Sequence, residues 1–291
     1  MIDEGAFIAA LRTLPLHAGA RGLRDDAAIL EIGDETLILT HDAMIEGRHW
    51  LPGQDMADIA WKLVAVNLSD LAAKGAEPVG ILLGHTLGDG DDRFLEGLHE
   101  VLTHYGVKLL GGDTVAGDGA RTLGCTAIGR ATHRPVPARR GARSGDAIYV
   151  TGPVGAAMLG FEALRDGNAK DSTAYRRPAP LLAEGRALAP HVTAMMDISD
   201  GLLLDCWRMA SAGDGIAFEI DSARVSVADP SRRGECMRWG DDYQLLFTAD
   251  PRTRLPVPAT RIGMVSNADL SPLRLDGKIL TPLDSIGYQH G

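Results

Sequence analysis

The stretch MMDISDGLLLD, residues 195–205, holds three aspartates in an otherwise apolar frame: Asp197, Asp200 and Asp205. A buried carboxylate without a partner is costly, because it loses the solvation of water and gains nothing in exchange. If this segment is a strand-to-helix turn, Asp197, Asp200 and the N-terminus of the new helix converge on one spot. The pattern therefore predicts a cation at this turn.

Further acids stand next to the other predicted strands and on one helix face. They are Asp25, Asp26, Asp42, Asp70 and Asp113, from RDDAA, LTHDAM, NLSD and GGDT. Asp70 shares its face with Asn67 and Lys74, and this polar stripe faces either water or a site. A single aspartate at a strand end is most often a turn former or helix cap. The combination, rather than any one member, indicates a site.

Magnesium prefers oxygen ligands, usually one or two carboxylates together with phosphates and water. Six or seven candidate acids exceed the need of one ion, which favours several ions around a nucleoside triphosphate and a second phosphate. The sequence has no GxxxxGK[ST] loop, so a phosphate site here does not use a Walker lysine. In such sites the protein mainly positions groups and neutralises charge.

The composition limits the class of protein. The chain has 291 residues, 45% hydrophobic and 23% charged, with 35 glycines, which is ordinary for one large or two medium globular domains. A formal net charge of −10 makes nucleic acid and anionic membranes improbable partners. The three cysteines form no CxxC pair, so we expect reduced thiols. We expect no signal peptide and no membrane span, and hence a cytoplasmic protein.

Short apolar runs alternate with amphipathic ones, which predicts a mixed α/β chain. Strands are expected at 27–32, 36–42, 79–87, 122–132, 147–152, 215–220, 243–249 and 259–265, with 107–114 a strand followed by a loop. Helices are expected at 57–74, 92–105, near 154–165, near 179–189 and after the 195–205 turn. Residues 133–146 hold two prolines and four arginines and are the best candidate linker. Two mixed α/β domains joined near residue 140 are predicted.

Seven motifs together resemble the thiamine-monophosphate kinase family in order and spacing, from about residue 20 to the C-terminus. They are RDDAAIL, LTHDAMIEGRHW, AVNLSDLAAKGAEP, LLGGDT, GDAIYVTG, MDISDGLLLD and GDDYQLLF. The resemblance extends to a superfamily with aminoimidazole ribonucleotide synthetase, selenophosphate synthetase and a hydrogenase maturation protein. It implies a metal- and nucleotide-binding domain, 1–135, whose mixed sheet pairs across a homodimer into a barrel. An α/β domain, 136–291, is expected to complete the active site.

The resemblance also implies a reaction and its residues. The reaction is ATP-dependent phosphorylation of thiamine monophosphate to thiamine diphosphate, by direct in-line transfer with several Mg²⁺ ions. The implied metal ligands are Asp26, Thr40, His41, Asp42, Asp70, Asp113, Asp197 and Asp200, of which Asp42, Asp70, Asp113 and Asp197 are the implied catalytic residues. The implied ATP contacts are Gly112, Asp113, Arg139 and Ser199, and the implied substrate contacts are His49, Asp241 and Tyr288.

Four positions depart from the family pattern: Arg24 and Trp239 replace glycines, His41 replaces a small hydroxyl residue, and Asp241 replaces a glutamate. His41 could then bind metal through its backbone oxygen. For Arg139, a solvated charge in an arginine-rich linker is the alternative to an ATP contact.

Two rival functions stay open. The first is another ATP-dependent enzyme of the superfamily; a selenophosphate synthetase would need a reactive cysteine near the N-terminus, whereas the first cysteine is Cys125. The second is a non-catalytic nucleotide-binding regulator, which the many retained like charges disfavour.

Overall fold

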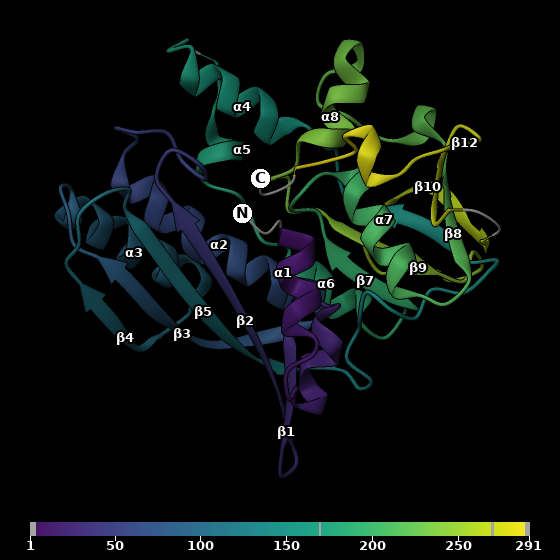
Figure 1. Ribbon diagram of the computed structural model, residues 1–291, viewed down its shortest axis with the longest axis horizontal. Coiled ribbons are helices and arrows are strands. Elements are labelled where there is room, and N and C mark those ends of the chain that lie inside the picture. The colour runs from purple at the N-terminus through teal and green to yellow at the C-terminus, as the bar shows by residue number, and fades with distance from the viewer. Residues whose placement is uncertain (1–3, 169, 269–270, 289–291) are drawn as a thin grey trace.

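A computed structural model describes residues 4–168, 170–268 and 271–288 (Figure 1). The described residues form two sheets, one in each half of the chain, and the predicted mixed α/β class is confirmed. The N-terminal half contains α1 (Glu4–Leu11), β1 (Ala28–Ile32), β2 (Glu35–Ile45), α2 (Met56–Ala73), β3 (Ala76–Thr86), α3 (Asp91–Tyr105), β4 (Leu109–Val115) and β5 (Thr122–Ala131).

The N-terminal sheet has the strand order β1-β2-β5-β3-β4, and only its β3–β4 pair is parallel among the described strands. Alternate side chains of β2 and β5, such as Ile38, Met44 and Cys125, are buried on the face that α2 covers. This alternation is what a half-covered strand requires, because successive side chains point to opposite faces. The other face carries Ile45 and Leu82, which are 38% and 39% exposed.

Helix α2 is buried on nearly every side. Asp55 caps its N-terminus by accepting a hydrogen bond from the Ala57 amide, and Gly75, at φ +61°, follows its C-terminus. The sheet and α3 pack on two sides of α2, and α6 from the C-terminal half packs on a third. A Cβ on Gly185 of α6 would lie 2.0 Å from the Ala72 carbonyl oxygen. The backbones of α2 and α6 therefore lie in direct contact, and this contact connects the N-terminal half to the C-terminal half.

The C-terminal half contains a seven-stranded sheet with the order β12-β11-β8-β10-β6-β9-β7. Its elements are β6 (Ala147–Val150), α4 (Ala156–Arg165), α5 (Thr173–Arg176), α6 (Leu182–Leu188), β7 (Ala194–Asp197), α7 (Leu202–Ala212), β8 (Ile216–Ile220), α8 (Arg233–Trp239), β9 (Leu245–Ala249), β10 (Thr260–Asn267), β11 (Leu273–Leu275) and β12 (Lys278–Ile279). Strands β6, β7 and β9 are wholly buried, as their continuous apolar sequences lead one to expect.

Residues 133–146 contain no helix or strand, yet they pack closely rather than forming a loose linker. Val136 is buried, and the Arg21 guanidinium donates hydrogen bonds to the carbonyl oxygens of Val136 and Pro137. This segment carries Arg139 to the boundary between the halves. Composition identified the connection but not its ordered contacts.

The loop expected after the strand of LLGGDT is wrong, because Gly111, Gly112 and Asp113 continue β4 and pair with β3. Both glycines have φ +154°, and a Cβ on Gly112 would lie 1.9 Å from the Leu83 carbonyl oxygen. The glycines therefore let two backbones approach closely inside a sheet. Over the described part of the chain, no helix combines the length and the apolar character that crossing a membrane needs.

Candidate active site

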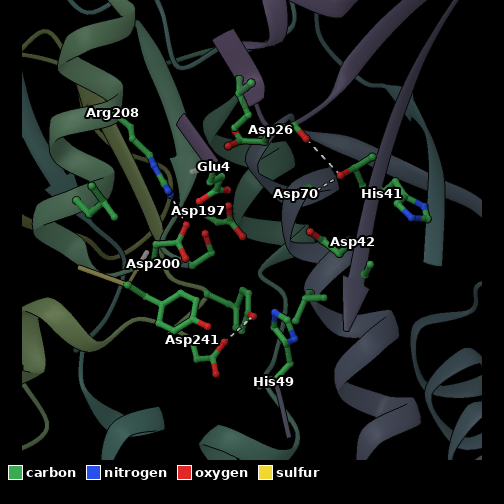
Figure 2. Close-up of a pocket in the computed structure, with 18 of the residues that line it drawn as sticks. Glu4, Asp26, His41, Asp42, His49, Asp70, Asp197, Asp200, Arg208 and Asp241 are labelled. Atoms are coloured by element: carbon green, nitrogen blue, oxygen red, sulfur yellow. Dashed lines mark hydrogen bonds and ion pairs between the residues drawn. The ribbon is translucent and has the colours of Figure 1, made fainter. Parts of the chain in front are cut away.

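A cavity of about 1520 Å³ opens at the boundary of the two halves. Its wall includes α1, β2 and α2 from the N-terminal half, together with the 197–212 and 239–243 segments from the C-terminal half. Single small-molecule sites usually measure about 300–1,000 Å³, so this cavity has room for two ligands. Figure 2 shows acids from both halves turned toward the same space.

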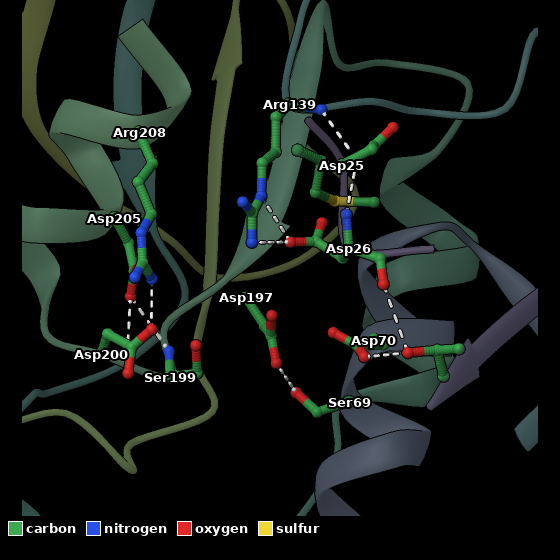
Figure 3. Close-up of polar contacts among 12 residues, drawn as sticks. Asp25, Asp26, Ser69, Asp70, Arg139, Asp197, Ser199, Asp200, Asp205 and Arg208 are labelled. Atoms are coloured by element: carbon green, nitrogen blue, oxygen red, sulfur yellow. Dashed lines mark hydrogen bonds and ion pairs between the residues drawn. The ribbon is translucent and has the colours of Figure 1, made fainter. Parts of the chain in front are cut away.

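Three of the predicted acids form one cluster. Ligand oxygens of Asp26, Asp70 and Asp197 all lie within 4.8 Å of one another. Asp26 precedes β1, Asp70 lies on α2 and Asp197 is the last residue of β7, so the fold assembles the cluster from distant segments. Figure 3 shows the three side chains turned toward each other. The cluster offers only oxygen donors, which suits a hard divalent cation.

Burial and mutual repulsion make two of these carboxylates, Asp70 and Asp197, hard to ionise without a cation. Burial, together with the negative charge of Asp26, raises the pKa of Asp197 to about 7. Burial and the charges of Asp42 and Asp197 raise the pKa of Asp70 well above its ordinary value. Ser69 donates a 2.5 Å hydrogen bond to Asp197. Such a group of buried acids with strongly shifted pKa values is typical of functional sites.

Asp26 is the ionised member of the cluster. Burial alone would raise its pKa, but Arg139 and Lys74 together lower it to about 2. The Arg139 Nε and Nη2 lie 2.6 Å and 2.5 Å from Asp26 Oδ1, and the Lys74 Nζ lies 2.5 Å from Oδ2. Lys74 also pairs with Asp25 at 2.5 Å. Arg139 is therefore an ordered part of the site rather than a solvated charge.

Strand β2 turns consecutive residues to opposite faces. The Thr40 hydroxyl contacts the Asp70 carboxylate and lies 3.2 Å from the Asp26 carbonyl oxygen. The His41 imidazole lies on the other face, 2.8 Å from the Thr126 hydroxyl, and points away from the acids in Figure 2. The side chain of His41 therefore does not join the cluster, and only its backbone oxygen keeps the predicted ligand role.

Asp42 lies beside the cluster on the same face of β2 as Thr40, and it lines the cavity. Its backbone amide donates to the Asn67 side-chain oxygen, which ties β2 to α2. Burial and the charges of Asp200 and Asp26 raise the pKa of Asp42 to about 6. The polar stripe of α2 thus faces the site and the interior rather than bulk water, since Asn67 is fully buried.

The 195–205 segment is the predicted strand-to-helix turn, but its three acids have different contacts and different roles. Asp205 is buried and accepts hydrogen bonds of 3.0 Å from the amides of Ser199 and Asp200, so it shapes the turn. Asp200 and Ser199 both line the cavity. The Asp200 carboxylate pairs with Arg208 and is not one of the three clustered acids (Figure 3).

The predicted substrate contacts lie at the other end of the cavity. The Asp241 carboxylate accepts a 2.7 Å contact from Lys62 and a 2.9 Å hydrogen bond from the Tyr243 hydroxyl. His49 and Tyr288 line the same cavity. In Figure 2, Asp241 and His49 lie together, away from Asp26. The cavity thus has two different ends: one is acidic, and the other contains the Lys62–Asp241 ion pair and aromatic side chains.

Helix α2 sets the spacing between these ends. Lys62, Val66 and Asp70 follow one another at i, i+4 and i+8, and all three line the cavity. Eight residues of α-helix span about 12 Å. The acidic end and the Asp241 end are therefore fixed on one rigid element.

Two predicted residues lie outside the cavity of a single chain. Gly112 and Asp113 are on β4, the exposed edge strand, and Asp113 accepts a hydrogen bond from the neighbouring Thr114 amide. Neither is among the residues that line the cavity. Within one chain, the structure does not bring these two residues to the clustered acids.

Sequence reasoning missed Lys62 and Arg208, the basic partners of Asp241 and Asp200. A lysine inside the apolar run IAWKLVAV, on the same helical face as Asp70, is the signal that could have identified Lys62. Ser69 was also missed, since nothing local distinguishes a serine that will meet a residue 128 positions away.

Comparison with known proteins follows the same division of the chain. Residues 24–131 match the family described as AIR synthase related protein, N-terminal domain, and residues 143–257 match its C-terminal domain. Thiamine-monophosphate kinase of Escherichia coli K12 is 38% identical over 304 residues, covering 92% of this chain and 91% of that protein. The chain belongs to the thiamine-monophosphate kinase family. A relative with the same name from Halobacterium salinarum is 34% identical and covers 96% of this chain and 98% of its own length.

Solved structures show that the family fold extends over the whole chain. The structure of AaThiL complexed with AMPPCP and TMP has a TM-score of 0.87 and 25% identity, covering 99% of this chain and 97% of that chain. The hydrogenase maturation protein HypE shares the fold, with a TM-score of 0.69 at 20% identity over 87% of this chain and 89% of its own. The predicted family resemblance and two-domain fold are confirmed.

Proposed function

We propose that the protein transfers the γ-phosphoryl group of ATP to the phosphate of thiamine monophosphate, giving thiamine diphosphate and ADP. Family membership over more than nine-tenths of the chain supports this, as does the similarity to a structure complexed with AMPPCP and TMP. The observation that carries the proposal is the cluster of Asp26, Asp70 and Asp197 in a cavity large enough for both substrates. An anionic acceptor phosphate needs neutralised charge more than it needs a general base.

Magnesium ions fit this donor set. Asp70 and Asp197 are buried acids without a basic partner at hydrogen-bond distance among the described contacts, and a divalent cation supplies the missing positive charge. Asp26, Asp70 and Asp197 would hold it, and Asp42 and Asp200 stand at the same cavity for further ions. A bound Mg²⁺ would supply positive charge that offsets the charge of the phosphate groups.

The chain's own residues supply orientation and charge. Arg139 keeps Asp26 ionised and places a guanidinium at the cavity wall, a group suited to forked contacts with phosphate oxygens. Asp205 holds the amides of Ser199 and Asp200 at the opposite wall. Because Lys62 and Asp70 stand on one helix, the organic part and the phosphate end of the acceptor bind at a fixed separation.

We also propose a homodimer, with residues 1–135 forming the pairing and metal-binding half and 136–291 completing the site. The N-terminal sheet supports this, since its uncovered face carries exposed Ile45 and Leu82 and every residue of its edge strand β4 is exposed. An exposed apolar face and an open edge are common at interfaces. Pairing would also give Gly112 and Asp113 a partner's cavity to enter.

The direct test incubates the purified protein with ATP, Mg²⁺ and thiamine monophosphate and follows both ADP and thiamine diphosphate. We expect equal amounts of the two products and none when Mg²⁺ is removed by chelation. ATP binding without a diphosphate product would instead support a non-catalytic regulator. ADP formation only with another acceptor would support a different enzyme of the superfamily.

A further inference from the structure

Aromatic side chains are concentrated around the cavity, and one group of them lies by Lys62 and Asp241. The chain has only four Trp, five Tyr and five Phe, yet Phe161, Tyr175, Trp207, Trp239, Tyr243 and Tyr288 all line this cavity. Three of them form a continuous group that we call the aromatic wall: Trp239, Phe161 and Tyr175. Ring centroids are 5.0 Å apart for Trp239–Phe161 and 5.2 Å apart for Phe161–Tyr175. These separations are those of favourable aromatic pairs.

Contacts with neighbouring residues fix the positions of the rings in the aromatic wall. Arg165 stacks over Phe161 at 5.7 Å, and the Tyr175 hydroxyl donates to the His49 carbonyl oxygen at 3.1 Å. The buried Asp58 of α2 pairs with Arg176 and Arg177, which fixes the end of α5 beside Tyr175. These contacts leave the rings little freedom to reorient, which lowers the entropy lost when a flat ligand packs on them.

The carboxylate next to the wall does not offer a free negative charge. Both oxygens of Asp241 are engaged, one by the buried ammonium of Lys62 and the other by the Tyr243 hydroxyl. The same ammonium lies 3.9 Å from the centroid of the Tyr175 ring and so occupies that face. The thiazolium of the acceptor is a flat cation, and with Asp241 neutralised its attraction must come largely from an aromatic face that is still open.

Trp239 provides that face. It is the last residue of α8, it is 36% exposed, and it lines the cavity beside Asp241. Its backbone is fixed, because a Cβ on the next residue, Gly240, would lie 2.4 Å from the Ser199 carbonyl oxygen and Gly240 has φ +101°.

We propose that Trp239, backed by Phe161, is a specificity-determining residue that stacks on the cationic ring of the acceptor. This inference depends on the proposed function for the identity of that acceptor. The ring compensates for the Asp241 carboxylate, whose oxygens Lys62 and Tyr243 already engage. It acts on acceptor affinity and has no part in the phosphoryl transfer at the acid cluster, which lies at the other end of α2.

The test compares Trp239→Leu with Trp239→Phe. We expect Trp239→Leu to raise the KM for thiamine monophosphate about tenfold, from the loss of one cation–π contact. The KM for ATP and kcat should change less than twofold, and Trp239→Phe should recover most of the affinity. Leu95→Ala, on the exposed side of α3, serves as a control far from the cavity. An unchanged acceptor KM in Trp239→Leu, or an equal rise in the KM for ATP, overturns the proposal.

Binding can be measured without turnover. Trp50 and Trp61 are buried and do not line the cavity, whereas Trp207 does, so the measurement uses a Trp207→Phe background, in which thiamine monophosphate should quench mainly Trp239 fluorescence. Trp239→Phe should remove most of this quenching, and this variant decides the matter if Trp239→Leu fails to fold. Quenching that persists unchanged in Trp239→Phe contradicts the inference. Quenching by Trp239 without any diphosphate product would support the inference while the proposed function fails.

Discussion

Asp26 and Asp70 are chemically identical side chains a few ångströms apart, and their surroundings shift their pKa values in opposite directions. Asp26 has two cationic partners, which hold its pKa at about 2. Burial and three neighbouring acids hold the pKa of Asp70 well above its ordinary value, against a hydrogen bond from the Thr40 hydroxyl that lowers it. The surroundings therefore stabilise the anionic form of Asp26, whereas the anionic form of Asp70 needs the charge of a bound cation.

Asp70→Asn tests this difference. We expect kcat to fall about 100-fold or more, because an amide cannot supply the negative charge that the ion needs. The metal-free variant should be at least as stable as the wild-type protein, since a buried carboxylate without a cationic partner has been removed. Steady-state kinetics and urea unfolding in EDTA measure the two effects. Activity close to that of the wild type would remove Asp70 from the metal site.

The pH dependence of stability follows from the raised pKa values. Those of Asp42 and Asp197 are about 6 and 7 in the folded protein, against 3.8 for an unperturbed aspartate. Between pH 4 and 7 the folded state therefore binds more protons than the unfolded state, and its free energy of unfolding falls as the pH rises. Asp26 acts in a separate window, because its lowered pKa costs stability only as the pH falls below about 4.

We expect the metal-free protein to lose thermal stability between pH 5.5 and pH 8, and Mg²⁺ to restore it at pH 8. Asp197→Asn should flatten this dependence and raise the Tm at pH 8 in EDTA by about 2–4 °C. Scanning calorimetry in EDTA and in Mg²⁺ measures both. A wild-type Tm that rises with pH in EDTA over this range would contradict the assignment.

At the scale of elements, helix α2 is the part on which the site depends. It packs against its own sheet, against α3 and against α6 of the other half, so few of its positions could accept a larger side chain. The close approach of α6 requires Gly185, whose absent side chain lets the Ala72 carbonyl reach the backbone. This contact fixes the halves relative to one another.

Gly185→Ala should destabilise the protein by about 1–3 kcal/mol, because the added methyl group overlaps the Ala72 carbonyl and the helices must separate. Gly117→Ala is the matched control, since a Cβ there meets nothing within 4 Å. Urea unfolding should show the large effect for the first variant and almost none for the second. Equal stability of the two variants would mean that α6 moves away from α2 at little cost.

At the scale of the whole molecule, the position of Asp113 requires a second chain if this residue acts in catalysis. Asp113→Asn and Asp70→Asn subunits should each be inactive alone. If Asp113 serves the partner's cavity, random mixing should restore about a quarter of wild-type activity, because half of the dimers then carry one intact site. Activity that stays absent after verified subunit exchange means that Asp113 acts within its own chain. Sedimentation analysis gives the mass of the assembly. We expect Leu82→Asp, on the uncovered face of the N-terminal sheet, to lower that mass to the mass of one chain.

The parts of this architecture that depend on local sequence patterns could be predicted from the sequence. The apolar periodicity of 57–74 gave α2 within one residue at each end, and the order of motifs gave the family. The edge strand through Gly112 was not predicted, because a double glycine usually marks a turn and only the tertiary approach of Leu83 makes it a strand. Partners such as Lys62 for Asp241 lie far apart in the chain, and no local rule pairs them.

Helix α2 also sets the distance between the two ends of the cavity. Lys62 and Asp70 are eight residues apart on a rigid helix, about 12 Å, and the buried surroundings of α2 keep the helix from bending. A molecule with one more phosphate between its ring and its terminal oxygen would overshoot the metal cluster once its ring was seated. For the proposed reaction, this fixed separation would limit transfer to a single addition without any group dedicated to rejecting the product.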